Sequence, residues 1–308
     1  MSSTDDVNAA AFGSVTGPRL SRRTLLLGSA LGAAAAVMPL SSAFAAPSYT
    51  AVPLLPYETS RLDTQTTTVG KKKYEEIDVV YKGDTIRLFV PHTAKPFKSS
   101  PAVTMVWYYH SNGSTHTSLS NVYKYSAMLA VDKGWVCVCP LYGGSLWTNN
   151  AAAAYQKSAV TYLNSYFNIG TSFLRANSGG GSLLTGAYGT GMVPKAKGIY
   201  LANGTYDMED LYARDPGRIG PVYDNDPALV AASNPARLPQ SAWTGSRIRA
   251  VVSQADFIVP PAQHGQALVE KADPVAAETS LMWHNQGHVV PDVVSTDMIK
   301  TFARWLTV

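Results

Sequence analysis

The feature of this sequence that most limits its fold is a series of short, continuous apolar runs separated by segments of helical periodicity. The clearest runs cover residues 102–109 and 135–139, in which almost every side chain is apolar. Such runs are typical of strands buried on both faces, as in parallel sheets covered by helices. Shorter runs lie at residues 172–177, 197–202, 247–253 and 279–283. The pattern therefore predicts an α/β fold with a central, mostly parallel sheet flanked by helices on both faces.

The segments around these runs complete the predicted architecture. Two β-rich runs, at residues 77–81 and 85–90, flank a Lys-Gly-Asp turn and predict a hairpin. Apolar residues at helical spacing predict helices over residues 118–132, 151–167 and 297–306. We expect the strands to begin only after a Pro- and Thr-rich lead-in, residues 47–70. The stretch 206–246 is richer in Asp, Pro and Gly, which favours an excursion or cap over the strand ends rather than a separate domain.

The N-terminal segment has the order of an export signal. An Arg22-Arg23 pair precedes an apolar stretch over residues 25–38, and a small-x-small cleavage motif ends at Ala45. The arginine pair resembles the twin-arginine (Tat) signal of bacteria. The apolar stretch is shorter than the roughly 20 residues that a spanning helix needs. We therefore expect removal of residues 1–45 after contact with the Tat translocase, leaving a domain over 46–308 that is secreted or held in the periplasm or cell envelope. The alternative is an uncleaved N-terminal anchor.

The charge and the cysteine content bear on two further properties, nucleic-acid binding and disulfide formation. The net charge is +4 and only 15% of residues are charged, so a dedicated nucleic-acid groove is not expected. The two cysteines, Cys137 and Cys139, lie two apart in one predicted strand and therefore point to one face. Their Cα atoms would be too far apart for an easy disulfide, which predicts two buried thiols. A chain that needs no disulfide can fold before export.

Ser178 is the first of three residues with possible chemistry that follow predicted strands. It stands in an Asn-Ser-Gly-Gly-Gly run, after residues 172–177 and before a helix-compatible stretch. A serine in a sharp strand-to-helix turn needs small neighbours, and the turn aims the N–H of Gly179 at whatever the serine attacks. The usual signature is Gly-x-Ser-x-Gly, and here Ala176 takes the first position. A phosphate-binding or plain turn serine is the alternative, and Ser182 is a rival nucleophile that would lie inside the helix.

The other two residues follow later strands. Asp256 comes just after residues 247–253, where a buried carboxylate could orient an imidazole, although a turn or helix-cap Asp has the same position. Asp207 is the alternative acid. His288 lies in a Gly-His pair past the last predicted strand, where a general base could reach Ser178. His284 is four residues earlier, but the glycine between the two makes a helical metal pair doubtful and no third ligand is present, so we expect neither metal nor cofactor.

The order Ser178, Asp256, His288, each after a strand, resembles the α/β-hydrolase superfamily over nearly the whole of residues 46–308. After the strand at 102–109, a His-Ser-Asn-Gly-Ser loop occupies the place of the His-Gly-rich oxyanion loop of esterases and lipases. Ser111 stands there in place of the usual Gly. The resemblance implies the α/β-hydrolase fold, with Ser178 as nucleophile, His288 as general base and Asp256 as the acid that orients it.

The same resemblance suggests the remaining site residues. The oxyanion hole would be formed by the backbone N–H of Gly179 together with that of Ser111 or Asn112. Residues near the mouth of the site are expected to contact substrate: Tyr109, His110, Tyr142 and Trp147.

By resemblance, the chain is expected to be a secreted serine hydrolase that cleaves a carboxylic ester, either a small molecule or an ester carried on a polymer. Two alternatives stay open: an acyltransferase or peptidase that uses the same triad, and a non-catalytic binding protein on the same scaffold. A lipase of aggregated lipid is not favoured, because residues 206–246 show no strongly amphipathic face.

Overall fold

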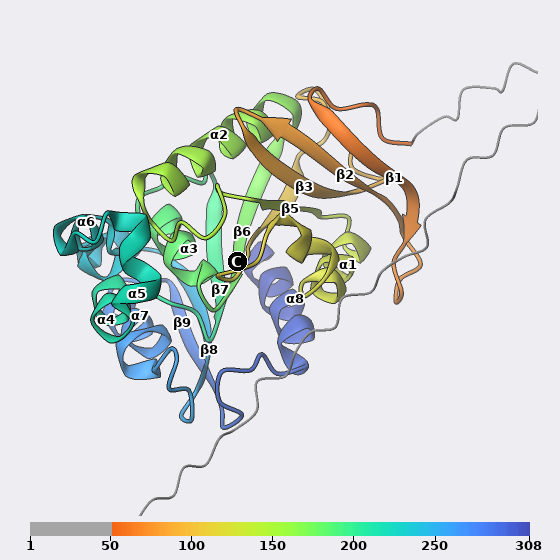
Figure 1. Ribbon diagram of the computed structural model, residues 1–308. Helices are drawn as coiled ribbons and strands as arrows, with labels where there is room; N and C mark the ends of the chain where they lie inside the picture. Colours follow the sequence, from red (N-terminus) through yellow and green to blue (C-terminus); the bar gives the residue numbers. More distant parts are fainter. Residues whose placement is uncertain (1–50) are drawn as a thin grey trace, which may run out of the picture. The chain divides into compact units, whose positions relative to one another are not determined.

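The computed structural model describes residues 51–308, so the predicted signal segment 1–45 lies outside the described residues. This part of the chain forms a nine-stranded sheet in the order β1-β2-β3-β5-β4-β6-β7-β8-β9 (Figure 1). The strands are β1 (Glu58–Thr66), β2 (Lys73–Tyr81), β3 (Asp84–Pro91), β4 (Val103–Tyr109), β5 (Val136–Pro140), β6 (Ile169–Asn177), β7 (Ala196–Ala202), β8 (Arg247–Ser253) and β9 (Glu278–His284). Strands β4 to β9 pair in parallel, while β1, β2, β3 and β5 pair antiparallel in turn. The predicted mostly parallel sheet is confirmed.

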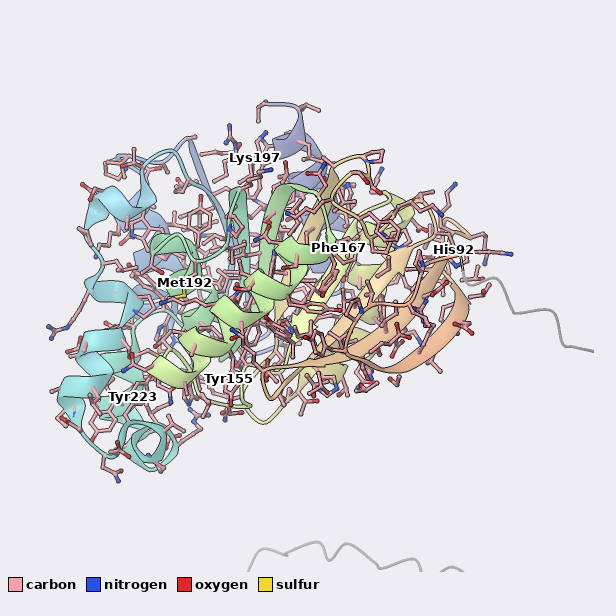
Figure 2. All side chains as sticks on the ribbon, turned by 90° about the horizontal axis from the view of Figure 1, so that it is seen from above. His92, Tyr155, Phe167, Met192, Lys197 and Tyr223 are labelled. Atoms are coloured by element: carbon pink, nitrogen blue, oxygen red, sulfur yellow. The ribbon has the colours of Figure 1, made fainter. Side chains whose placement is uncertain are left out.

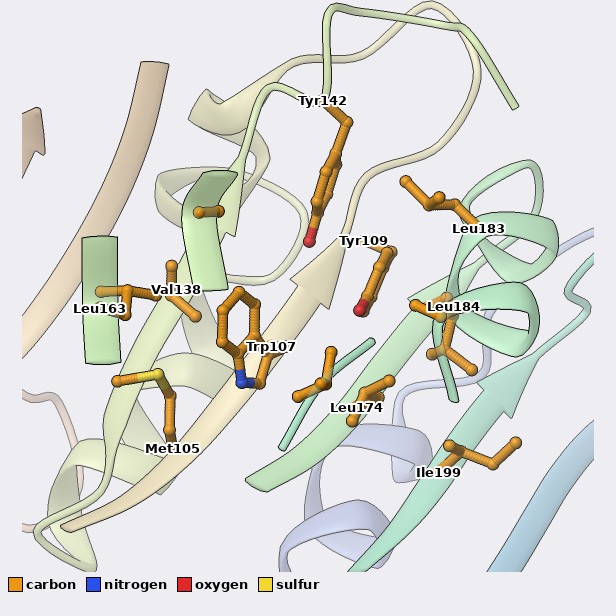
Figure 3. Packing of buried hydrophobic residues seen from close by; sticks show 14 of the residues in the cluster. Met105, Trp107, Tyr109, Val138, Tyr142, Leu163, Leu174, Leu183, Leu184 and Ile199 are labelled. Atoms are coloured by element: carbon orange, nitrogen blue, oxygen red, sulfur yellow. The ribbon is translucent and has the colours of Figure 1, made fainter. Parts of the chain in front are cut away.

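Helices cover both faces of the sheet. They are α1 (Lys124–Asp132), α2 (Asn150–Tyr166), α3 (Gly180–Gly189), α4 (Met208–Arg214), α5 (Pro216–Ile219), α6 (Pro227–Ser233), α7 (Gly265–Ala272) and α8 (Val293–Leu306). One apolar core unites the sheet with α2, α3 and α7, and a second unites it with α1 and α8. Met105, Trp107 and Tyr109 alternate along β4 and enter the first core. Figure 3 shows Tyr109 beside Leu184 and Met105 on the side of Leu163.

Two predicted elements differ from the structure. Strand β1 falls inside the lead-in where no strand was expected. It is an edge strand whose residues are mostly exposed, so it lacks the apolar pattern that marks the central strands. Helix α1 begins at Lys124 rather than at 118, after a 3-10 turn, His116–Ser120. Because of this later start, Val122 and Tyr125 are 61% and 45% exposed instead of buried, and Tyr123 is buried in their place.

The remaining boundaries shift by a few residues or add an element. Helix α8 begins at Val293, four residues before its predicted start, and α7 was not predicted. Cys137 and Cys139 are both buried and free, as expected. Within residues 51–308, no helix is sufficiently long and apolar to cross a membrane.

The stretch 206–246 connects β7 to β8 through α4, α5, α6 and several 3-10 turns. It has a small apolar cluster of its own, which packs around Trp147 from outside the stretch. The members of the cluster from this stretch are Met208, Leu211, Ile219, Tyr223 and Val230. The excursion is therefore joined to the rest of the fold by the loop that carries Trp147.

Candidate active site

Ser178 lies in a sharp turn between β6 and α3. Its φ of 46° is in the left-handed region, which a non-glycine residue adopts only when the surrounding structure holds it there. Its N–H donates to Ala202 O (3.2 Å), and its carbonyl accepts from the N–H groups of Gly181 (3.0 Å) and Thr205 (2.9 Å). These bonds tie the turn to the end of β7 and the segment after it, and they keep the strained residue in a single conformation.

The glycines after Ser178 permit the close approach of α3 to the sheet. A Cβ on Gly180 would lie 2.7 Å from His110 O, and one on Gly181 would lie 2.5 Å from Thr205 O, distances that real Cβ atoms do not adopt. Ala176, which replaces the usual first glycine, is fully buried in the apolar core of α2, α3 and α7. The fold therefore accommodates alanine at this position of the signature, because the methyl group of Ala176 packs in the core.

The turn brings Ser178 against His288, and His288 against Asp256. Ser178 Oγ lies 2.8 Å from His288 Nε2, and His288 Nδ1 lies 2.7 Å from Asp256 Oδ2. An ionised carboxylate only accepts hydrogen bonds, so the ring proton is on Nδ1 and Nε2 is free to accept from the serine hydroxyl. This is the tautomer that a general base for Ser178 requires.

Asp256 is held as a buried carboxylate. It is 2% exposed, and its Oδ1 accepts the N–H groups of Ile258 (3.0 Å) and Val259 (2.9 Å). Burial by itself raises the pKa of Asp256, but the bonds from His288, Val259 and Ile258 outweigh it and hold that pKa below its ordinary value. The carboxyl group is therefore ionised at neutral pH and stabilises a protonated His288.

Two residues that the sequence did not single out position the loop of His288. Ser253 Oγ, at the end of β8, accepts Gly287 N–H at 3.0 Å. Asn203, just past β7, donates through Nδ2 to Val289 O at 2.7 Å, and its Oδ1 lies 3.1 Å from His284 Nε2. His284 thus has a structural role here, and burial lowers its pKa. The available signal for both missed residues was their place at the carboxyl ends of parallel strands.

The backbones of Gly179 and Asn112 lie close together and line the same small cavity beside Ser178. Within the described chain, Gly179 N and Asn112 N donate no hydrogen bond, and a Cβ on Gly179 would lie only 2.9 Å from Asn112 N. Of the two loop residues predicted for this role, Asn112 is therefore the one whose N–H lies next to Gly179. The backbone N–H of Ser111 also donates no hydrogen bond within the described chain, while the Ser111 hydroxyl donates to Asn177 O at 3.3 Å. The pair of free donors can stabilise an oxyanion.

The four residues expected to contact substrate are all buried. Tyr109 and Tyr142 stack with ring centroids 5.1 Å apart, and Figure 3 shows their hydroxyl ends pointing toward the core rather than toward an open mouth. His110 is held between Leu141 O (2.7 Å) and Ser111 O (3.0 Å). Trp147 packs beside Gly179. All four nevertheless line a small cavity that also touches Asn112 and Gly179, so their contact with substrate stays a prediction.

The rivals named from the sequence have other contacts. Asp207 is the N-cap of α4 and accepts Glu209 N–H (3.0 Å) and Asn234 Nδ2–H (2.7 Å), so it is not the acid beside His288. Ser182 is fully buried inside α3, where its hydroxyl donates to Gly179 O at 3.2 Å. Residues 51–308 contain no group of three His, Cys, Asp or Glu side chains arranged to hold a metal ion.

Comparison with solved structures identifies the fold. The chain is similar to an esterase of Pyrococcus furiosus, with 11% identity over 82% of this chain and 100% of that one and a TM-score of 0.57. It is also similar to an S-formylglutathione hydrolase from Agrobacterium tumefaciens, with 14% identity over 81% and 98% of the two chains and a TM-score of 0.60. The chain has the α/β-hydrolase fold.

The likeness does not extend to recognisable sequence similarity. A bifunctional GH43-CE protein of Bacteroides eggerthii shares the fold over 80% of this chain but only 38% of its own length, with 14% identity and a TM-score of 0.56. No protein-family model and no curated protein sequence matches the chain. In an α/β-hydrolase fold the loops at the carboxyl ends of the parallel strands converge, which is how β6, β8 and β9 bring Ser178, Asp256 and His288 together.

A further contact, absent from the sequence predictions, ties the excursion to the loop of Asp256. Arg214 at the end of α4 donates through Nη1 to Phe257 O (3.3 Å) and Ile258 O (3.1 Å), and it pairs with Asp210. His264, fully buried before α7, lies 3.2 Å from Asp210 Oδ2 through Nε2. We call Asp210, Arg214 and His264 the clasp. No local pattern marks it, because its members lie up to 54 residues apart (264 minus 210).

Proposed function

We propose that this α/β-hydrolase-fold protein is a serine hydrolase that cleaves a carboxylic ester through an acyl-enzyme formed on Ser178. The observation that carries the proposal is the continuous hydrogen-bonded chain from Ser178 Oγ through His288 to the buried Asp256, with distances of 2.8 and 2.7 Å. The strained turn at Ser178 and the two free N–H groups beside it support the same chemistry. Among the solved structures of similar fold are an esterase and an S-formylglutathione hydrolase.

In the first half of the reaction, Ser178 Oγ attacks the ester carbonyl carbon while His288 Nε2 takes the hydroxyl proton. The carbonyl oxygen becomes an oxyanion, which the N–H groups of Gly179 and Asn112 stabilise. One such donor is typically worth about 3–4 kcal/mol in the transition state. Asp256 stabilises the imidazolium that forms. The tetrahedral intermediate then collapses, His288 returns its proton to the leaving alcohol, and the acyl group stays on Ser178.

In the second half, water takes the place of the alcohol. His288 Nε2 accepts a proton from the water as its oxygen attacks the acyl carbon, and the same two N–H groups hold the second oxyanion. Collapse returns the proton to Ser178 Oγ and releases a carboxylic acid. Each half-reaction restores the neutral His288 and the ionised Asp256, so the cycle needs no cofactor.

Two of the alternative functions use the same acyl-enzyme with a different acceptor or substrate. In the third, no acyl-enzyme forms. An alcohol or an amine in place of water would make the protein an acyltransferase, and an amide substrate would make it a peptidase. A binding protein on this scaffold would tolerate change at Ser178. The hydrogen-bonded chain from Ser178 through His288 to Asp256 favours the enzyme, since a binding protein does not require an activated serine. We also propose that the enzyme acts outside the cytoplasm, on the strength of the Arg22-Arg23 segment.

The deciding experiment is labelling of the purified domain, residues 46–308, with a fluorophosphonate probe, alongside hydrolysis of p-nitrophenyl acetate. We expect Ser178→Ala to abolish both signals and Ser182→Ala to retain both. Labelling that survives Ser178→Ala would refute the nucleophile, and an unlabelled, inactive wild type would favour the binding protein. Product analysis with a competing alcohol would separate hydrolysis from acyl transfer.

A further inference from the structure

A large cavity lies apart from Ser178, along the outer side of α3. It has a volume of about 410 Å³ and is bounded by α3, the start of α2 and the excursion. Leu183, Gly186 and Met192 line it on the α3 side, and Tyr223 and Leu229 line it from the excursion. Figure 2 shows Met192 and Tyr223 on the side of the molecule where α2 begins. A cavity of this size suits a ligand group of moderate length.

The walls of the cavity favour an uncharged, apolar occupant. Several of its polar side chains already have partners within the protein: Thr148 Oγ1 lies 3.0 Å from Tyr223 Oη, and Asn149 donates to Val222 O at 3.0 Å. Among the described residues that line the cavity, Asp224 is the one with a charged side chain, and it is exposed. A carboxylate or phosphate would therefore meet a like charge and find no cation. An aliphatic chain would leave no buried polar group without a partner.

The cavity adjoins the reacting centre through two side chains. Leu183 lines both this cavity and a much smaller one, about 20 Å³, which touches Asn112 and Gly179. Trp147 lines the smaller cavity, while Thr148, the next residue, lines the larger one. Trp147 and Leu183 thus form a partition between the free N–H groups beside Ser178 and the large cavity.

The position of His288 indicates on which side of Ser178 the leaving alcohol of an ester lies, and on which side the acyl group lies. His288 must give its proton to the leaving alcohol, so the alcohol lies on the His288 side of Ser178 Oγ. Of the described residues that line the large cavity, none belongs to the loops that carry His288 or Asp256. The cavity is therefore on the side of the acyl group.

We propose that the large cavity binds an uncharged aliphatic acyl chain, which enters it between Trp147 and Leu183. The proposal rests on the proposed ester hydrolysis at Ser178 and names the acyl class that the site selects. The smaller cavity holds roughly one water molecule, so an acetyl group fits without the large cavity and a long chain does not.

The backbone at Trp147 has an unusual conformation. Trp147 has a φ of 54°, and Gly143 and Gly144 nearby also have positive φ, at 72° and 95°. A bulky residue in this region is strained and persists only where the surrounding structure holds it. The start of the loop is held at Asp84, which accepts the N–H groups of Tyr142 and Gly143 at 3.0 Å. On the other side of Trp147, Thr148 N–H donates to Tyr223 Oη at 3.2 Å, so a chain that enters between Trp147 and Leu183 requires the Trp147 side chain to move.

The proposal can be tested with a substitution on α3 whose side chain fills the cavity. A Cβ on Gly186 would make ordinary contacts, 3.4 Å to Thr148 and 3.7 Å to Pro235, so Gly186→Leu places its side chain in the cavity within a regular helix. Gly186 lies six residues along α3 from Gly180, roughly 9 Å at 1.5 Å per residue, a distance that an octanoyl chain spans and an acetyl group does not. We expect the ratio of kcat/KM for p-nitrophenyl octanoate to that for the acetate to fall about tenfold or more.

Ala154→Leu is the matched control, because Ala154 is exposed on α2 and does not line the cavity. For Ala154→Leu, the ratio of kcat/KM for the octanoate to that for the acetate should equal the wild-type ratio. If Gly186→Leu does not fold, Leu229→Trp fills the cavity from α6, where the side chain is already 41% exposed. An unchanged ratio in a folded cavity-filling variant, with hydrolysis that still depends on Ser178, overturns the acyl site alone. Loss of Ser178 dependence, or an inactive wild type, overturns the proposed function and this inference with it.

Discussion

At the scale of single residues, the site contains an unfavourable backbone conformation and a buried charge, and hydrogen bonds from neighbouring groups stabilise both. Ser178 adopts a left-handed backbone because three main-chain hydrogen bonds hold it and because Gly180 and Gly181 let α3 approach the strands. Asp256 is ionised although buried, because three hydrogen bonds outweigh the burial that raises its pKa. Each residue is therefore unfavourable by itself and stable only with its neighbours, which is typical of functional sites.

Replacement of Asp256 by Asn should remove the correct tautomer of His288 without removing the side chain. An amide Nδ2–H opposite His288 Nδ1 favours the ring with its proton on Nε2, which cannot accept from Ser178. We expect kcat for p-nitrophenyl acetate to fall by about 10⁴ at neutral pH. Asp207→Asn is the control, since an Asn oxygen can still cap α4, and its kcat should stay near that of the wild type. Equal losses in the two variants would contradict the assigned acid.

Replacement of Gly180 by Ala should disturb the turn itself. The added Cβ would overlap the carbonyl groups of Tyr109 and His110, which cannot retreat because β4 is paired on both sides. We expect the free energy of unfolding in urea to fall by about 1–3 kcal/mol, and kcat to fall by about 10²-fold as Ser178 shifts. Gly217→Ala adds a methyl group in open space on α5 and should change neither quantity appreciably. A stable, active Gly180→Ala protein would be inconsistent with the close approach described.

At the scale of elements, the excursion is connected to the catalytic loops at both ends of the site. Its apolar cluster packs on Trp147, beside the free N–H groups. The clasp joins α4 to the backbone of Phe257 and Ile258, next to Asp256. Within the clasp, His264 Nδ1 accepts the N–H groups of Tyr206 and Asp207, both at 3.1 Å, so the buried ring is neutral.

The neutral His264 makes stability depend on pH. Burial lowers the folded-state pKa of His264 to about 4, from an ordinary value of 6.5. Above pH 6.5 neither folded nor unfolded chain binds this proton, so the contribution of His264 is fully present. As pH falls from 6.5 toward 4, the unfolded chain binds the proton first and the folded state loses up to about 3 kcal/mol.

The measurement is urea unfolding at about pH 7 and about pH 4.5 for the wild type and His264→Gln. Glutamine can accept and donate at the same positions but does not titrate. The wild type should lose about 2–3 kcal/mol more than the variant between the two pH values. Other acidic and basic groups titrate in both proteins and cancel in the difference. The same loss in both proteins would show that His264 is not the group responsible.

At the scale of the whole molecule, one sheet serves both stability and chemistry. Parallel strands β4 to β8 are buried between two apolar cores, and β9 lies partly exposed at the sheet edge. The carboxyl ends of β6, β8 and β9 converge on Ser178, Asp256 and His288. The antiparallel strands β1 and β2 lie at the other edge of the sheet and contribute no residue to the site.

For the full chain, replacement of Arg22 and Arg23 by Lys should block export of the folded protein. Lys keeps the charge but lacks the planar, five-donor guanidinium that a receptor for two arginines reads. We expect the double variant to stay in the cytoplasmic fraction, while the wild type leaves it with a mass that corresponds to cleavage after Ala45. Arg19→Lys, outside the pair, should be exported normally. Export of the double variant would contradict the Tat prediction, and an exported but uncut chain would favour the anchor.

The sequence alone determined the α/β architecture and the places of Ser178, Asp256 and His288, because buried strands and strand ends are marked by local periodicity. It missed β1, since an exposed edge strand has no such pattern. Only the tertiary structure decided which acid meets His288, that Asn112 N lies next to Gly179, and that Tyr109 is fully buried. It alone revealed the clasp and the cavity along α3. These features depend on contacts between residues far apart in the chain, 110 positions for Ser178 and His288, and no local period encodes the packing that brings them together.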